Sequence, residues 1–151
     1  MRAIVQRVKE SAVSVDGETT GRIGPGMMVL LGVSREDTEE DADYLVDKIV
    51  NLRIFQDDQQ KMNRSLLQTE GAMLVVSQFT LYGDYSKGRR PSFVHAAAPE
   101  TAEALYTYFI NRVKEKGIVT AQGRFGAMMD VHLINDGPVT LIVHSKQEAR
   151  I

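Results

Sequence analysis

Apolar residues in the first part of the chain form short, partly alternating runs, and this spacing predicts strands. Residues 3–8 and 11–15 are rich in β-branched side chains, and an Asp-Gly pair at 16–17 supplies a hairpin turn. Residues 18–23 are then expected to form the returning strand. Residues 27–33 are apolar almost throughout, which predicts a central strand that is buried on both faces.

The spacing becomes helical after residue 34. Asp37 and Glu40 have the spacing of a capping box, with Asp in place of the usual Ser or Thr. Acidic side chains within residues 36–41 suit the start of a helix, where the dipole favours negative charge, better than they suit a metal site. A second helix is predicted between Pro99 at its start and Gly117 at its stop. The apolar faces are Ala42, Leu45, Val46, Ile49 and Leu52 in the first helix, and Ala102, Leu105, Tyr106, Phe109 and Val113 in the second.

The remaining pattern completes one domain. Residues 54–55 begin a short strand, residues 72–76 form a second buried strand, and the polar tail at 145–151 is expected to fray. The order of elements predicts a single compact α/β domain over residues 1–151. Its core is a mixed but mainly antiparallel sheet or half-barrel with two main helices.

The last two predicted strands, residues 128–134 and 139–144, flank an unusual turn at residues 135–138. Its sequence is Asn-Asp-Gly-Pro, and Asp-Gly between two apolar runs is a strong hairpin signal. Pro138 complicates the hairpin because it offers no N–H to the ladder and fixes its own φ. Taken alone, the turn favours a trans Gly137–Pro138 bond, since only about 5–6% of X–Pro bonds in folded proteins are cis.

Composition narrows the classes of protein that the chain can represent. Its 151 residues fit one domain with a real core, and no apolar run approaches the ~20 residues of a membrane span. The absence of cysteine excludes disulfides, thiolate catalysis and cysteine-based zinc sites. The sequence shows no signal peptide, so a cytoplasmic location is expected.

Charge argues against non-specific coating of nucleic acid, because the formal net charge is −2 and the isoelectric point is near 5.9. A nucleic-acid partner therefore needs a local basic patch. Lys87, Arg89 and Arg90 form one, although an ordinary solvated loop is the better explanation at this stage.

Two stretches combine a strand with an abrupt polar end, which is where binding and catalytic groups usually lie: residues 77–80 and residues 135–140. Ser77 and Thr80 offer hydroxyls and Gln78 an amide. Strand alternation would send Gln78 and Thr80 to one face. Hydrogen bonding to the backbone at a strand end explains these side chains equally well at this stage.

Familiar catalytic groups are missing from the sequence. His95, His132 and His144 lack metal-binding spacing, although the last two flank the predicted hairpin and are placed to meet across it. No nucleophile elbow or phosphate-binding loop is present, and neither a metal nor a cofactor is expected. Any hydrolysis would depend on backbone donors, amides and groups of the substrate.

The two stretches together closely resemble the signature motifs of D-aminoacyl-tRNA deacylases, first described as D-tyrosyl-tRNA deacylases. They read Ser-Gln-Phe-Thr-Leu at residues 77–81 and Asn-Asp-Gly-Pro-Val-Thr at residues 135–140. The resemblance runs nearly end to end. It includes residues 4–8, 30–33, 53–55, 61–63, 90–93, 102–106 and 120–125.

The resemblance implies hydrolysis of the ester in D-aminoacyl-tRNA, and of glycyl-tRNA, by a homodimer. Gly137 and Pro138, joined by a cis bond, would enter the partner's active site, capture the α-amino group through their carbonyls and exclude L side chains. The substrate's own 2′-hydroxyl would assist, with Thr80 as a positioning group and, in a minority interpretation, the nucleophile. The family pattern implies these roles: Ser77, Gln78 and Thr80 are catalytic; Phe79, Leu81, Arg7, Gly137 and Pro138 bind substrate; Phe125 and Met129 line the adenosine end; and Lys87, Arg89 and Arg90 bind tRNA.

Three alternatives remain open at this stage. One is an editing module similar to the N-terminal domain of archaeal threonyl-tRNA synthetases, which shares the fold and removes L-serine. Another is a related deacylase with a trans Gly-Pro bond. The third is a non-catalytic nucleic-acid-binding protein that uses the basic loop.

Overall fold

The computed structural model describes residues 1–146, and these form one α/β domain. The strands are β1 (Arg2–Val15), β2 (Glu18–Ile23), β3 (Gly26–Gly32), β4 (Phe55–Gln56), β5 (Met62–Arg64), β6 (Ala72–Ser77), β7 (Thr120–Gln122) and β8 (Asp130–His144). The helices are α1 (Glu39–Val50), α2 (Leu66–Thr69), the 3₁₀ helix η1 (Phe79–Tyr82) and α3 (Pro99–Glu115).

The main sheet is mixed, as the sequence predicts. Its order is β2-β1-β3-β6-β7, and β8 pairs with β1 outside this path. β1 is antiparallel to β2, β3 and β8, whereas β6 is parallel to β3 and β7. The sheet curls until β2 approaches β7, where a Cβ on Gly21 would lie 2.6 Å from the backbone oxygen of Gln122. Only glycine permits this approach, so the predicted half-barrel is confirmed.

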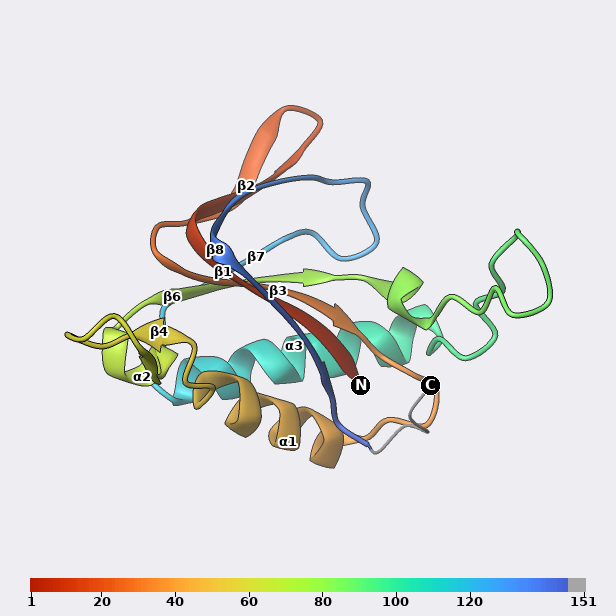
Figure 1. Ribbon diagram of the computed structural model, residues 1–151. Coiled ribbons are helices and arrows are strands. Elements are labelled where there is room, and N and C mark those ends of the chain that lie inside the picture. Colours follow the sequence, from red (N-terminus) through yellow and green to blue (C-terminus); the bar gives the residue numbers. More distant parts are fainter. Residues whose placement is uncertain (147–151) are drawn as a thin grey trace.

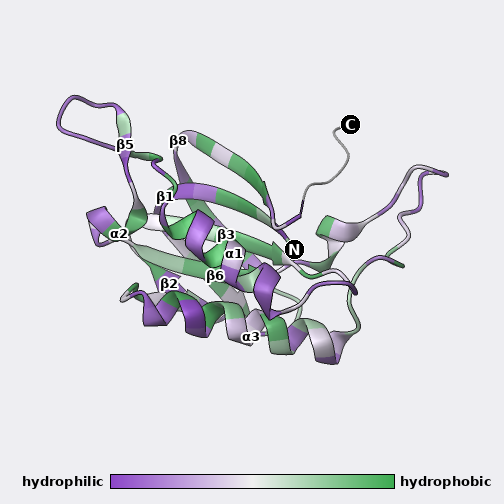
Figure 2. Ribbon diagram, turned by 90° about the horizontal axis from the view of Figure 1, so that it is seen from below, coloured by the Kyte–Doolittle hydropathy of each residue, from purple (hydrophilic) through white to green (hydrophobic). Residues whose placement is uncertain are grey.

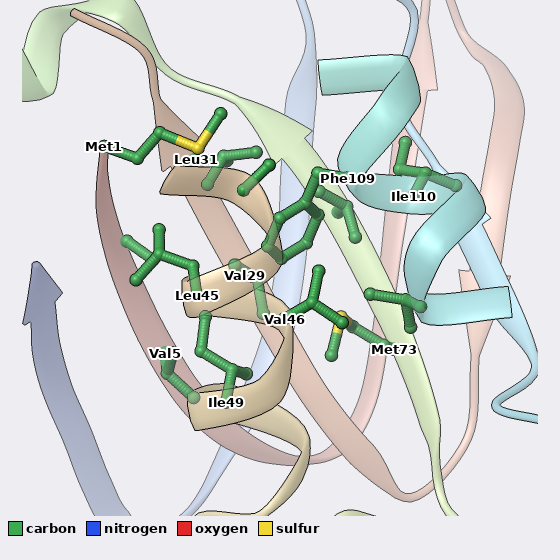
Figure 3. Packing of buried hydrophobic residues seen from close by; sticks show 14 of the residues in the cluster. Met1, Val5, Val29, Leu31, Leu45, Val46, Ile49, Met73, Phe109 and Ile110 are labelled. Atoms are coloured by element: carbon green, nitrogen blue, oxygen red, sulfur yellow. The ribbon is translucent and has the colours of Figure 1, made fainter. Parts of the chain in front are cut away.

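The two main helices cover one face of the sheet and build the larger core. In Figure 1, α1 and α3 lie side by side beneath the strands. Figure 3 shows Leu45 and Ile49 of α1 and Phe109 of α3 directed toward Val29 and Met73 of the sheet, and all five are fully buried. A smaller cluster around Val13 and Leu74 fills the opposite, concave face. Two long loops, after β4 and after η1, extend away from this core and are mainly hydrophilic (Figure 2).

The start of α1 lies one residue away from the predicted position. Thr38 is the N-cap, and its N–H donates to Asp41 Oδ2 at 2.9 Å, so the capping box is Thr38/Asp41 and not Asp37/Glu40. Asp37 is buried and instead accepts from the Met1 ammonium at 2.7 Å. Burial by itself would raise the pKa of Asp41, but hydrogen bonds from the Thr38 N–H and the Ser145 hydroxyl hold that pKa below its usual value.

The predicted final hairpin is wrong. β8 is one 15-residue strand that pairs with β1 on both sides of residues 136–139, from Ser14 opposite Asp130 to Arg2 opposite His144. Likewise, the two short runs at the start of the chain are halves of the single 14-residue β1. Bulges within one continuous ladder produced the apparent breaks in both patterns. The expectation of a frayed tail is also wrong at its start, because the Ser145 N–H donates to Met1 O at 2.9 Å; residues 147–151 lie outside the described residues.

Candidate active site

The first signature stretch lies where β6 ends and the chain turns into η1. Ser77 pairs with Leu31 of β3, and the next N–H, from Gln78, donates to the Leu31 carbonyl at 2.8 Å. The backbone then leaves the sheet, so the strand alternation predicted for residues 77–80 does not extend beyond Ser77. Gly32 lies beneath the turn, and a Cβ there would approach Leu81 Cβ to 3.0 Å and Gln78 O to 3.1 Å. Its missing side chain lets η1 rest on β3.

η1 borders a cavity of about 640 Å³. The polar side chains that line it are Ser77, Gln78 and Thr80. The remaining lining residues are apolar: Val33, Val76, Phe79, Phe93, Ala96, Ala97, Pro99, Ala102, Phe125, Gly126, Ala127, Met128, Met129 and Val131. No Asp, Glu, His, Lys or Arg occurs in this lining. An apolar cleft with a few converging polar groups is the usual form of a small-molecule site.

A hydrogen bond joins the two polar groups that face each other across the turn. Gln78 Nε2 donates to Thr80 Oγ1. Because the Thr80 oxygen is already accepting, its own O–H proton remains available to donate to a group in the cavity. The pair therefore presents one oriented hydroxyl donor to whatever binds there.

A buried tyrosine and a close-packed glycine support Phe125 and Met129, two residues of the cavity lining. The Tyr106 hydroxyl donates to Val75 O at 2.9 Å, and its ring lies 5.8 Å from that of Phe125. Burial raises the pKa of Tyr106 to about 12, so the hydroxyl stays protonated as a donor at neutral pH. A Cβ on Gly123 would come within 2.6 Å of Met129 Sδ, so glycine at this position lets Met129 pack against the chain. Phe125 and Met129 thus both line the cavity, and their contact with adenosine stays a prediction.

Several residues that line this cavity were not predicted from the sequence. Phe93 packs edge-on against Phe79, with ring centroids 4.9 Å apart, and Ala96, Ala97 and Met128 complete the lining. The one available signal was the matched segment at 90–93, which ends in Phe93. Leu81, by contrast, lies outside the lining; its carbonyl accepts from Arg2 Nη1 at 2.7 Å.

The second signature stretch forms an outward loop in β8. Thr140 pairs with Gln6 and Asn135 with Val8, so four residues, Asp136–Val139 in sequence, stand opposite Arg7 alone. The Gly137–Pro138 bond is cis, as the resemblance implied and contrary to the expectation from the turn alone. Both residues are exposed and neither lines the cavity.

Arg7 anchors the inner side of this loop. Its guanidinium is buried, and it donates through Nε to Asp136 O at 2.9 Å and through Nη1 to Ile54 O at 2.6 Å. The Asp136 carboxylate lies 3.5 Å from the same Nε. One planar cation thus connects Asp136, just before Gly137, to Ile54, just before β4.

The basic residues and histidines lie elsewhere. Lys87, Arg89 and Arg90 are exposed on the loop whose ends are joined by the Asp84 and Ser92 backbones at 2.8 Å. His132 and His144 do not meet, because they stand opposite Ala12 and Arg2, near the two ends of β1. Within residues 1–146 there is no cluster of three or more His, Cys, Asp or Glu side chains suited to a metal ion. No described helix has the length and hydropathy needed to cross a membrane.

Comparison with known proteins places this geometry in a family. Residues 4–144 match the family model described as D-Tyr-tRNA(Tyr) deacylase. This chain belongs to that family. A D-aminoacyl-tRNA deacylase of Desulfatibacillum aliphaticivorans is 63% identical over 146 residues, which cover 97% of this chain and 100% of the relative. The corresponding protein of Bacillus velezensis is 59% identical over 147 residues, with coverage of 97% and 100%.

Two solved structures share the fold. A structure titled c-Myc DNA Unwinding Element Binding Protein superimposes with a TM-score of 0.91 at 41% identity, covering 97% of this chain and 100% of the other. A probable eukaryotic D-amino acid tRNA deacylase gives a TM-score of 0.80 at 22% identity, covering 94% and 97%, which shows the fold alone.

Proposed function

We propose that this protein hydrolyses the ester bond of D-aminoacyl-tRNA, and of glycyl-tRNA, releasing free tRNA and the amino acid. The observation that carries the proposal is the η1 cavity: an apolar cleft with one amide–hydroxyl pair and no ionisable side chain, in a chain of the deacylase family. A tRNA-directed activity fits the cytoplasm, and the proposal invokes no metal or cofactor.

The chemistry of the cavity favours positioning over covalent catalysis. An alcohol nucleophile needs a neighbouring base to remove its proton, and the lining contains none for Thr80. An ester already has a reasonable leaving group, so orienting water and the substrate's 2′-hydroxyl, with donors near the developing oxyanion, is sufficient. Thr80, oriented by Gln78, is then a donor to the substrate and forms no acyl intermediate.

Replacement of Thr80 tests this role. Thr80→Val is expected to lower kcat on D-tyrosyl-tRNA about 10- to 100-fold, because valine has nearly the shape of threonine but lacks the positioned hydroxyl donor. Thr80→Ser keeps the hydroxyl and should stay within about threefold of the wild type. Rapid-quench kinetics check the mechanism: a burst of tRNA release, with an acylated enzyme trapped in the wild type, would contradict the positioning role.

We also propose that the active unit is a homodimer in which Gly137 and Pro138 of one chain enter the cavity of the other. Support comes from the family resemblance and from three features of the single chain. Gly137 and Pro138 are exposed and lie outside the lining of their own cavity, that lining has no carboxylate to pair with an α-ammonium group, and apolar side chains around it are uncovered. Phe79 is 56% exposed and Met128 is 91% exposed.

Chirality follows from that arrangement. Main-chain carbonyls of the inserted residues would accept from the α-amino group, and a rigid backbone on one side would leave no space for an L side chain. Glycine, which has no side chain, would pass. D side chains would point away from the backbone, so many of them should be accepted.

The basic loop is the proposed contact with tRNA phosphates. Joint replacement of Lys87, Arg89 and Arg90 by Ala should weaken tRNA binding and reduce the slope of log K against log salt by about 2 to 3. The matched control replaces Lys48 and Lys114, which lie on the main helices, and Lys116, which caps the end of α3; all three are exposed. Equal salt slopes for both triple variants would mean that the loop is an ordinary solvated surface and does not contact tRNA phosphates.

A second candidate function is nucleic-acid binding without catalysis. The 41% identical solved structure is named for binding a DNA element, and the same exposed basic loop would serve such a role. Tight binding of tRNA or DNA by a protein that leaves every aminoacyl ester intact would favour this candidate.

A further inference from the structure

The outward loop of β8 is secured on its outer side by a single amide. Asn135 Oδ1 accepts from the Val139 N–H at 2.8 Å, and Asn135 Nδ2 donates to the Val139 carbonyl at 3.3 Å. The side chain thereby bonds both backbone groups of the residue at which the chain returns. In a regular ladder a neighbouring strand would satisfy these groups, but β1 offers only Arg7 opposite the loop.

The same amide connects the loop to the regular ladder. Asn135 Nδ2 also donates to Thr140 Oγ1 at 3.1 Å, and Gln6 Nε2 of β1 donates to that hydroxyl at 3.2 Å. Gln6 and Thr140 are the last regular pair before the loop. Asn135, the residue before the loop, therefore bonds Val139, the last residue of the loop, and Thr140, which is itself bonded to β1 through Gln6.

Two side chains, Arg7 and Asn135, anchor the two ends of the loop. Arg7 binds the Asp136 carbonyl, at the departing side, from the buried face. Asn135 binds Val139, at the returning side, from the more exposed face. Gly137 and Pro138 lie between these two anchors. Among residues 1–146, no other side-chain hydrogen bond to residues 136–139 is seen.

We propose that Asn135 is a positioning residue that sets where Gly137 and Pro138 stand, and thereby sets the stereochemical selectivity of the reaction. This inference rests on the proposed function, in which these two residues discriminate D from L substrates in the partner's cavity. Asn135 itself touches no reacting atom. Without the Asn135 amide, Val139 loses its side-chain anchor while Arg7 still holds Asp136. Gly137 and Pro138 can then shift, and the space that they deny to an L side chain becomes open.

The consequence is a change in selectivity greater than the change in the rate for the D substrate. Asn135→Ala is expected to lower the ratio of D-tyrosyl-tRNA to L-tyrosyl-tRNA hydrolysis at least about tenfold, because a displaced steric barrier no longer excludes the L side chain. Asn135→Asp keeps an acceptor for the Val139 N–H but loses both donated bonds, so its ratio should fall between those of the wild type and Asn135→Ala.

The experiment compares kcat/KM for both esters in the wild type, Asn135→Ala, Asn135→Asp and the control Asn51→Ala. Asn51 is an exposed amide that donates to its own helix at Asp47 O, 2.8 Å away, far along the chain from the site. Amide hydrogen exchange at Val139 supplies a readout independent of activity; it should accelerate in Asn135→Ala and stay unchanged in Asn51→Ala.

The outcomes separate the inference from the function on which it rests. A purely structural defect lowers both rates by the same factor, and an unchanged D/L ratio in Asn135→Ala would overturn the inference while leaving the proposed function intact. Unchanged exchange at Val139 would overturn it as well. A wild type that does not prefer the D ester overturns the proposed function and, with it, the role of Asn135.

Discussion

A heterodimer built from two inactive chains is expected to recover about half of the wild-type activity. One chain carries Gln78→Ala with Thr80→Val, and the other carries Gly137→Val. If Gly137 and Pro138 act in the partner's cavity, one of the two sites combines an intact cavity with an intact loop. The other site combines both defects.

The two defects have separate physical causes. Gln78→Ala with Thr80→Val removes the amide–hydroxyl pair of the cavity. Gly137→Val perturbs the loop alone: φ at Gly137 is 152°, and a Cβ there would lie 2.7 Å from the Val139 nitrogen. Each homodimer is therefore expected to fall about 100-fold or more below the wild type.

A matched heterodimer reverses the result. It pairs a wild-type chain with a chain that carries all three substitutions, and it should be inactive because every site receives one defect. If the loop instead acts on its own chain, this second heterodimer is half active and the first is inactive. Different C-terminal tags on the two chains allow each heterodimer to be isolated, and failure to isolate any dimer would contradict the proposed assembly.

Local patterns predicted much of the fold. The β2 strand, the two main helices, Pro99 at the start of α3 and the left-handed Gly117 after it all follow from short-range preferences, and all are present. The buried strands β3 and β6 were also predicted, because continuous apolar runs indicate burial on both faces.

Errors arose where an interaction distant in sequence decides the local structure. The break at residues 135–138 resembles a hairpin, but the continuous ladder with β1 accommodates it as a loop within one strand. The capping box was displaced by one residue because Asp37 is used by the Met1 ammonium, a partner 36 positions away. η1 and the strands β5 and β7 are only three or four residues long, too short for a periodic signal.

The site was predictable in its parts and not in its assembly. Ser77, Gln78 and Thr80 line the cavity together with Phe125 and Met129, which are about fifty residues farther along the chain and were connected to them only through the family resemblance. Gly137 and Pro138 do not line the cavity of their own chain, so the two signature stretches do not share one pocket within a single chain.

The stereochemical preference is the second large effect that the proposed function predicts. D-tyrosyl-tRNA should be hydrolysed at least about 100-fold faster than L-tyrosyl-tRNA, a difference in activation free energy of about 2.7 kcal/mol. The physical reason is exclusion: the inserted backbone meets an L side chain and leaves a D side chain free. Glycyl-tRNA, which presents no side chain, should react at a rate nearer to that of the D ester.

The most direct measurement is therefore the initial rate of ester hydrolysis by the purified protein on matched D-tyrosyl-, L-tyrosyl- and glycyl-tRNA, with spontaneous hydrolysis subtracted. We expect rapid loss of the D and glycyl esters and an L ester that decays near its spontaneous rate. Rapid hydrolysis of L-tyrosyl-tRNA, or no acceleration for the D ester, would contradict the proposed function.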